Sequence, residues 1–271
     1  MSLLAAPDTL LAPEIREFYV HSMELMRDGG VPFLVGGAYA FARYTGIERH
    51  TKDFDVFILR EDFPKAKRVF EAAGYKSELI FPHWLGKAIK GEDFVDLIFG
   101  AGNGVATVDE LWFDNAVDDK VFGVDVKLIP AEEMIWSKGS IMERERYDGA
   151  DVAHVILAVG DRMNWRHLID RYGPRWRTLY AHLVLFGFIY PSKRSQVPAW
   201  VMAELGGRIA EETEQADALE KICYGTIISR QQYLTDVDQW GFEDGRLRPI
   251  GNMTAEDIAR WTAGIVVDGS K

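Results

Sequence analysis

Two adjacent glycines that close a short apolar run constrain the first part of this 271-residue chain more than any other feature. Residues 31–35 have the pattern of a buried strand, Gly36 and Gly37 follow, and residues 38–44 have the pattern of a helix. A strand that turns into a helix at paired glycines lets backbone N–H groups approach an anion closely, and the helix N-terminus adds partial positive charge. The pattern therefore predicts a phosphate-binding turn.

A pair of acids follows the glycines on the next predicted strand, residues 53–59. Because side chains alternate along a strand, Asp53 and Asp55 share one face while Phe54 points into the core. Neighbouring carboxylates repel one another unless a cation or a proton lies between them, and Mg²⁺ prefers such hard oxygen ligands. Taken alone, an Asp-x-Asp pair is more often a solvated strand edge, because acids favour the surface.

A third acid, Asp96, lies in another predicted strand, residues 94–99, between Val95 and Leu97. Burying a lone carboxylate among apolar neighbours costs free energy. The position becomes reasonable if Asp96 faces the same metal or accepts a proton from an attacking hydroxyl. The convergence of the glycine turn, the acid pair and Asp96 favours an active site over a solvated edge.

The remaining pattern predicts strands and helices up to Pro130 and mostly helices after it. We therefore expect two domains, residues 1–130 and residues 131–271. The glycine-rich residues 100–104 suggest a flexible loop. Before the boundary we predict helices at residues 13–30 and 61–73 and strands at 75–81, 84–89 and 121–129; after it, helices at 131–138, 148–159, 165–172, 175–188 and 198–218.

The ordered series Gly36-Gly37, Arg49-x-Thr51-x-Asp53-x-Asp55 and Asp96 resembles the nucleotidyltransferase superfamily of the DNA polymerase β type. It is similar in particular to the small bacterial branch that includes AbiEii-type toxins and antibiotic nucleotidyltransferases. Residues 130–138 and 145–152 are similar to the helix pair that follows the core in that branch, where a lysine, here Lys138, typically reaches toward the nucleotide phosphates. The chain departs from the pattern at Ala38, because many catalytic relatives carry serine or threonine nearby.

The resemblance implies an α+β fold, with a mixed β-sheet flanked by helices and then a helical C-terminal domain. It implies transfer of a nucleoside monophosphate from a nucleoside triphosphate (NTP) to a hydroxyl of RNA, protein or a small molecule, with release of pyrophosphate. Asp53, Asp55 and Asp96 would hold two magnesium ions, and Asp96 would also help to deprotonate the acceptor. The residues expected to contact the nucleotide are Gly36, Gly37, Arg49, Thr51 and Lys138.

Other interpretations stay open. The chain could be a catalytically degenerate member that acts as a binding or regulatory module, for instance in a toxin–antitoxin pair. Lys138 could simply be a favourable charge at a helix C-terminus. Asp148 and Asp151 fit a structural pair better than metal ligands. His50 lies near the acids in sequence, and we expect it at the surface.

The net charge of −11 makes nucleic acid an unfavourable partner on average. Most of the excess lies in residues 1–150, with 26 acids and 17 bases. Residues 161–194 instead carry seven bases and two acids, interleaved with Trp165, Tyr172, Trp176 and Tyr180. This stretch, Arg162–Arg194, suits an RNA or small-molecule acceptor. Helical spacing favours the alternative, in which the aromatic side chains face the core and the arginines face water.

The chain has one cysteine, Cys223, which excludes a disulfide framework or a cysteine metal cluster. The N-terminus lacks the basic and apolar regions of a secretory signal, and no apolar stretch is long enough to span a bilayer. We therefore expect a cytoplasmic protein without membrane association.

Overall fold

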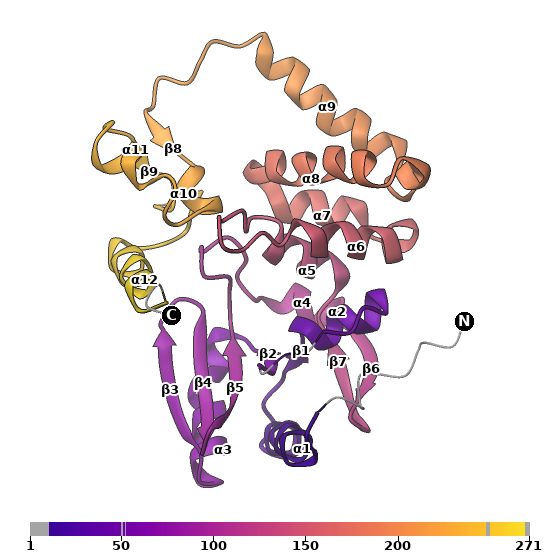
Figure 1. Cartoon of the computed structure of the whole chain (residues 1–271), viewed down its shortest axis with the longest axis vertical. Helices are drawn as coiled ribbons and strands as arrows, with labels where there is room; N and C mark the ends of the chain where they lie inside the picture. Colours follow the sequence, from indigo (N-terminus) through magenta and orange to yellow (C-terminus); the bar gives the residue numbers. More distant parts are fainter. Residues whose placement is uncertain (1–10, 50, 52, 248–249, 269–271) are drawn as a thin grey trace. The chain divides into compact units, whose positions relative to one another are not determined.

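The computed structural model describes residues 11–49, 51, 53–247 and 250–268. The chain divides into two compact units (Figure 1). Unit 1 comprises residues 1–102 and 107–130, and unit 2 comprises residues 103–106 and 131–271.

Unit 1 is built on a seven-stranded mixed sheet with the strand order β3-β4-β5-β2-β1-β7-β6. The central strand β2 pairs in parallel with β5 and antiparallel with β1, while β1 pairs in parallel with β7. The outer pairs β3–β4, β4–β5 and β6–β7 are antiparallel. The strands are β1 (Leu34–Val35), β2 (Asp55–Phe57), β3 (Lys76–Phe81), β4 (Leu85–Lys90), β5 (Asp93–Ile98), β6 (Val117–Val121) and β7 (Val124–Leu128).

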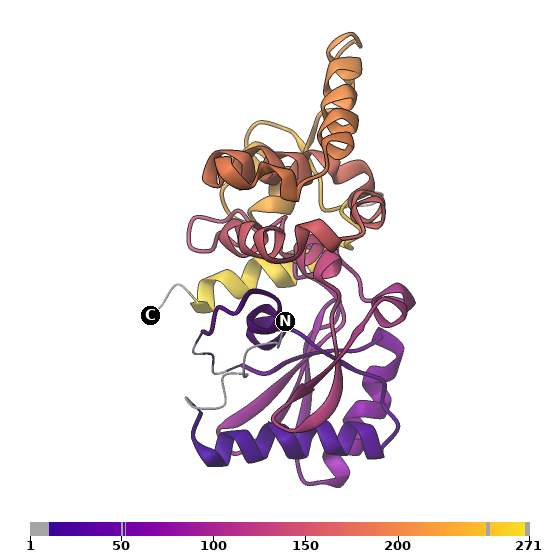
Figure 2. The same cartoon turned by 90° about the vertical axis from the view of Figure 1, so that its right-hand side faces the viewer.

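The helices of unit 1 flank this sheet. They are α1 (Pro13–Asp28), α2 (Gly37–Thr45), the 3-10 turn η1 (Arg60–Asp62), α3 (Phe63–Ala72) and α4 (Glu110–Asp114). Helix α1, which runs along the lower edge of unit 1 in Figure 2, packs against β5, β7 and α3. Pro13 suits its first turn because the missing N–H of proline would have no partner there anyway.

Aromatic side chains fill the core beside the central strand. Phe54, which immediately precedes β2, is fully buried, and its ring stacks on the ring of Tyr19 from α1 with centroids 4.6 Å apart. Tyr39 from α2 meets the Phe54 ring edge-on at 5.3 Å and the Phe122 ring at 5.2 Å. This packing fixes Phe54 inward, so that its neighbours in the chain face the other way.

Unit 2 is mostly helical. Helix α5 packs on α6 and α7, and α8 packs on α6, α7 and α9. A small parallel ladder joins β8 and β9. The elements are α5 (Ala131–Lys138), α6 (Gly149–Val159), η2 (Gly160–Arg162), α7 (Trp165–Tyr172), η3 (Gly173–Arg175), α8 (Trp176–Ile189), η4 (Pro191–Gln196), α9 (Ala199–Thr213), β8 (Ile222–Cys223), α10 (Gly225–Ile228), α11 (Leu234–Asp238), β9 (Glu243–Asp244) and α12 (Ala255–Asp268).

The predicted fold class is confirmed: a mixed sheet flanked by helices precedes a mostly helical region. The helix expected at residues 198–218 ends earlier, at Thr213. Two further details differ from the expectations. The strand expected at residues 121–129 is interrupted by a tight turn at Phe122 and Gly123, both with positive φ, which joins β6 to β7. The glycine-rich loop is not loose, because Asn103 is buried and its Nδ2 donates to the carbonyl of Ile227 at 2.9 Å.

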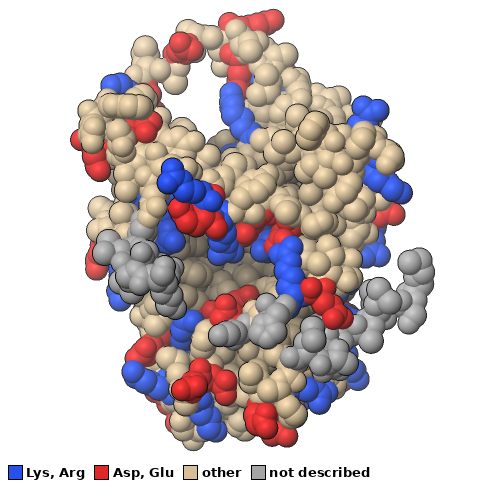
Figure 3. All heavy atoms as spheres, viewed as in Figure 1, with Lys and Arg blue, Asp and Glu red and all other residues tan. Residues whose placement is uncertain are grey.

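Among the described residues, no helix is both long and apolar enough to cross a membrane. Acidic and basic side chains are interspersed over the face shown in Figure 3. The net charge of −11 is therefore not concentrated in a single acidic field on that face.

Candidate functional site

Two of the three predicted acids are direct neighbours in the sheet. Strands β2 and β5 are parallel, and their register pairs Asp55 with Asp96. Neighbouring strands lie about 4.8 Å apart, and paired residues of parallel strands point to the same face. The fold therefore brings together two carboxylates that lie far apart in the sequence.

The third acid, Asp53, lies in the extended segment that leads into β2. The N–H of Asp96 donates to the carbonyl of Phe54 at 3.0 Å, which ties this segment to β5. Asp53 is exposed while Phe54 is fully buried, so the alternation expected from the sequence is present. Thr51 shapes the entry to this segment. Its hydroxyl accepts the N–H of Asp53 at 3.1 Å and donates to the carbonyl of Asp53 at 3.2 Å.

A lysine that was not predicted from the sequence binds Asp96. Lys87 on β4 is paired in register with Asp96, and its Nζ lies 2.8 Å from Asp96 Oδ1. The same ammonium lies 3.6 Å from the centroid of the Phe94 ring. One signal was available in the sequence: Lys87 stands inside a mostly apolar predicted strand, as Asp96 does.

The electrostatics of the site follow from burial and from repulsion between acids. Burial raises the pKa of Asp96 above its ordinary value, the Lys87 ammonium opposes this shift, and the nearby charge of Asp53 adds to it. Burial also raises the pKa of Tyr19 to about 12, with smaller contributions from Asp53, Asp93, Asp55 and Asp96. A cation bound among these carboxylates would relieve the repulsion.

The paired glycines lie directly against the site. Gly36 caps α2, and its N–H donates to the carbonyl of Asp55 at 3.0 Å. Gly37 has a φ of +53°, and a Cβ at this position would lie 1.9 Å from Asp55 Oδ2. Only glycine both tolerates this conformation and leaves room for the carboxylate. The N-terminus of α2 therefore adjoins the Asp55 side chain, as a phosphate-binding turn beside an acid pair requires.

Two other expected nucleotide contacts have partners of their own. The exposed guanidinium of Arg49 lies over the Phe41 ring, 4.5 Å from its centroid. Lys138 belongs to unit 2, where its Nζ lies 2.9 Å from Asp151 Oδ2 and 3.5 Å from Asp148 Oδ2. These ion pairs agree with the structural interpretation of the two aspartates. His50 falls outside the described residues.

The donor set of the site suits a hard divalent cation. Asp53, Asp55 and Asp96 offer carboxylate oxygens, the ligands that Mg²⁺ prefers. As the side chains stand in the described part of the chain, no three His, Cys, Asp or Glu residues are grouped closely enough to hold a metal ion. In this arrangement the Lys87 ammonium supplies the positive charge next to Asp96. The three acids thus fit the metal in chemistry, and Asp55 and Asp96 also fit it in strand register.

The basic and aromatic stretch of unit 2 is largely committed to internal contacts. Trp165, Tyr172 and Trp176 are buried. The Arg166 guanidinium forms a bidentate ion pair with Glu204, at 3.0 and 2.7 Å. Arg171 Nε donates to Glu133 at 2.9 Å, and Arg177 pairs with Glu212. These contacts follow the interpretation in which the aromatic side chains face the core.

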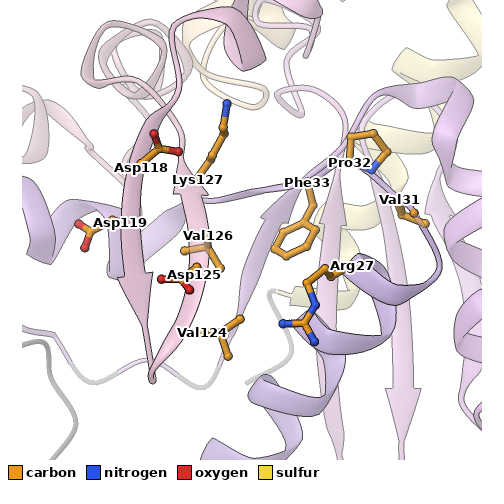
Figure 4. A pocket seen from close by; sticks show the side chains of 11 residues that line it. Arg27, Val31, Pro32, Phe33, Asp118, Asp119, Val124, Asp125, Val126 and Lys127 are labelled. Atoms are coloured by element: carbon orange, nitrogen blue, oxygen red, sulfur yellow. The ribbon is translucent and has the colours of Figure 1, made fainter.

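A pocket of about 560 Å³ opens elsewhere in unit 1, beside β7. Figure 4 shows the side chains of Arg27, Phe33 and Lys127 around it. Strand β1 pairs with β7 through Val35 and Leu128, and the pocket lies where the chain before β1 diverges from β7. Its lining contains none of the predicted site residues, so the pocket is separate from the acid cluster.

No family model matches this chain, and neither does any curated protein sequence. Among solved structures, the antibiotic-resistance factor ANT(2'')-Ia in solution is similar with a TM-score of 0.44 and 15% identity, over 64% of this chain and 96% of that one. The lincosamide antibiotic adenylyltransferase LnuA, bound to lincomycin, has a TM-score of 0.38 and 16% identity, over 54% and 96% of the two chains. ANT(2'')-Ia in complex with adenylyl-2''-tobramycin has a TM-score of 0.39 and 16% identity, over 73% and 99%.

Proposed function

We propose that this chain is a magnesium-dependent nucleotidyltransferase that moves a nucleoside monophosphate from an NTP to a hydroxyl acceptor and releases pyrophosphate. The observation that carries the proposal is the in-register pairing of Asp55 with Asp96 on parallel strands. Asp53 lies on the same segment as Asp55, and the Gly36–Gly37 turn lies against the Asp55 carboxylate. These are the parts that nucleotidyl transfer needs: carboxylates for a cation and a turn for phosphate.

In this proposal Asp53, Asp55 and Asp96 hold two magnesium ions. Bound there, magnesium would neutralise the charge that builds up on the phosphate and on the attacking oxygen. The acceptor oxygen attacks the α-phosphorus, the bond to pyrophosphate breaks, and the acceptor proton passes to Asp96. Burial already raises the pKa of Asp96, which favours its taking up that proton.

The turn and the segment after α2 would hold the nucleotide. Backbone N–H groups at Gly36 and Gly37 would contact phosphate, and the exposed Arg49 would add a positive charge. Thr51 would act by fixing the backbone of Asp53. Lys138 would bind a phosphate by exchanging its contacts with Asp148 and Asp151 for it.

The acceptor is an RNA, a protein or a small molecule, and the Arg162–Arg194 stretch is where we expect an anionic one to bind. Arg162, Lys193 and Arg194 are exposed there, whereas Arg166, Arg171 and Arg177 are engaged with glutamates. Because the reaction consumes an NTP, we expect the protein to work in the cytoplasm.

The test is transfer of label from α-labelled NTPs, with magnesium, to RNA, protein and small-molecule hydroxyl acceptors. We expect the Asp53→Asn/Asp55→Asn double variant to lose at least about 1,000-fold in rate, because several kcal/mol of charge stabilisation would be lost. The matched control is Asp125→Asn on β7, whose side chain is 87% exposed and outside the site. Equal label transfer by the double variant and the wild type would contradict the proposal.

One observation favours a second candidate, a degenerate nucleotidyltransferase fold that binds or regulates without transfer. The Lys87 ammonium, 2.8 Å from Asp96, can balance that carboxylate without a metal. Calorimetry with an NTP, with and without magnesium, separates the two. Binding that needs magnesium and is lost in Asp55→Asn supports the enzyme, whereas magnesium-independent binding without transfer supports the module. In the enzyme, Lys87→Met should bind magnesium more tightly, because Asp96 loses its resident cation.

A further inference from the structure

Helix α8 in unit 2 exposes an apolar stripe. Its members are spaced as one face of a helix, and they are Ala181, Val184, Leu185, Phe188 and Ile189; we call them the α8 stripe. The Phe188 side chain is 83% exposed, and Val184 is 50% exposed. The opposite face of α8, which includes Leu179, Leu183 and Phe186, is buried against its neighbours. A helix that is apolar on both faces is normally covered on both.

The composition of α8 suits pairing with an identical surface. Between Arg177 and Lys193 the sequence contains no Asp, Glu, Lys or Arg. In a two-fold dimer each residue meets the same patch on the other copy, so like charges within the patch would repel. An uncharged apolar stripe avoids this repulsion.

The ends of the hairpin formed by α8 and α9 carry opposite charges. The two helices pack together (Figure 1), and the ion pair between Arg177 and Glu212 joins the start of α8 to the end of α9. At one end of this hairpin η4 exposes Lys193 and Arg194. At the other end α9 and the residue after it expose Glu211 and Glu214, which outnumber the exposed Arg177, and the Arg177 guanidinium is paired with Glu212. An antiparallel pairing of two α8 helices would place the basic end of each copy beside the acidic end of the other.

We propose that the α8 stripe is the centre of a two-fold homodimer in which α8 packs antiparallel against α8 of a second copy. The 14 residues of α8 span about 21 Å. The area buried by a single pair of helices is at the small end of the range for stable interfaces. The charged ends of the hairpin add to it, and we expect a Kd in the micromolar range. The α8 stripe does not depend on the transfer reaction, because none of its residues belongs to the acid cluster or to the charged residues proposed for the acceptor.

Sedimentation velocity of the full chain, from about 1 to about 100 µM, is the first test. We expect the wild type to shift from monomer to dimer, and Phe188→Glu to raise the Kd at least about 100-fold, because burying a charge replaces burying a ring. The matched control is Leu111→Glu on α4 of unit 1, where the wild-type side chain is 44% exposed. The control should dimerise like the wild type. Circular dichroism and thermal unfolding check that both variants fold.

Charge reversal tests the orientation. Lys193→Glu/Arg194→Glu should weaken the dimer about tenfold or more, and Glu211→Lys/Glu214→Lys should do the same. Combining all four changes should restore the wild-type Kd, because each basic end then again meets an acidic end. If the combined variant is as weak as either pair alone, the antiparallel arrangement is overturned.

Cross-linking gives a second measure of orientation, in a Cys223→Ser background that removes the native thiol. Leu185 is at the middle of the stripe, so Leu185→Cys should form a disulfide with its own copy under mild oxidation. Ala181→Cys and Ile189→Cys should each fail alone and cross-link when mixed. Self-cross-linking of Ala181→Cys would overturn the antiparallel arrangement, and a wild type that stays monomeric at every concentration would overturn the dimer itself.

Discussion

Two carboxylates, the fully buried Glu133 in unit 2 and the mostly buried Asp96 in unit 1, have different surroundings. Burial raises the pKa of both. Glu133 Oε1 has two hydrogen-bonding partners, His167 Nε2 at 2.8 Å and the Arg171 guanidinium through Nε at 2.9 Å. Asp96 receives Lys87 but also lies in register with one acid and is repelled by another.

The difference separates a structural charge, Glu133, from the charge that we propose to be functional, Asp96. The Glu133 side chain is fully buried, and its Oε1 links helix α5 to His167 and Arg171 of helix α7. The Asp96 side chain is 13% exposed and lies among like charges that folding alone gives no reason to gather. In the first arrangement a carboxylate and a guanidinium each depend on the other, so losing one leaves the other poorly compensated. The second arrangement gathers like charges, as the cation site that we propose would require.

The largest effect should come from removing the structural carboxylate. We expect Glu133→Ala to lower the free energy of unfolding by about 3–5 kcal/mol, because Arg171 would be left buried without its partner and a cavity would remain. Urea unfolding measures this change. Glu133→Gln is the milder comparison, since its amide oxygen can still accept both hydrogen bonds. A loss below about 1 kcal/mol for the alanine variant would remove the distinction drawn here.

The next largest effect should come from substituting Gly37, which lies against the Asp55 carboxylate. Gly37→Ala places a methyl group where Asp55 Oδ2 lies and strains a residue with a φ of +53°. We expect a stability loss of about 1–3 kcal/mol together with loss of nucleotidyl transfer. Gly91→Ala is the control, because its φ of +67° is equally strained and no atom lies within 4 Å of the added Cβ. If both variants keep full transfer, Gly37 does not serve the Asp55 carboxylate.

Removing the Asp96 carboxylate, which we propose to be functional, should leave the fold intact. At neutral pH we expect Asp96→Asn to abolish transfer while the free energy of unfolding stays the same or rises by up to about 1 kcal/mol. The reason is that the ionised Asp96 is disfavoured in the folded state, as its raised pKa shows. Parallel urea unfolding and transfer assays check both parts. A marked loss of stability would place Asp96 with Glu133 as a structural acid.

The smallest effect should be the pH dependence of the stability difference between Asp96→Asn and the wild type. It is measured in the presence of a metal chelator. A group whose pKa is raised on folding contributes stability that is fully present below its unfolded pKa and is lost as the pH rises through its folded pKa. For Asp96 the loss begins near its ordinary value of 3.8 and continues to the raised value. Wild type and Asp96→Asn should therefore have converging stabilities near pH 3.8 and differ above it. Constant separation at all pH values would contradict this account.

Local patterns predicted much of the fold and of the candidate site. The spacing of apolar residues gave helices at 131–138 and 165–172 that coincide with α5 and α7. Strand alternation correctly placed Phe54 inside and Asp53 outside. The expectation that Asp55 and Asp96 face one site agrees with their register, because a lone acid among apolar residues has few stable alternatives.

The features that sequence reasoning missed depend on register or on distant partners. Lys87 meets Asp96 only through the β4–β5 pairing, which no local pattern specifies. The turn at Phe122 uses a positive φ at a residue type that rarely adopts one. Whether Lys138 binds a phosphate or carboxylates depends on which groups lie beside the end of α5. In the structure these groups are Asp148 and Asp151.

Residues 103–106 belong to unit 2 although they lie among the residues of unit 1 in the sequence, and this affects the order in which the two units can fold during synthesis. Residues 107–130 return to unit 1. The carbonyl that Asn103 binds, on Ile227, follows it by 124 residues. At about 5–20 residues per second, a ribosome needs about 6–25 s to supply that partner. The link between β5 and α4 therefore cannot reach its final structure until residue 227 has been synthesised. A fragment that ends at residue 130 would contain residues 103–106 without the residues of unit 2 that they contact.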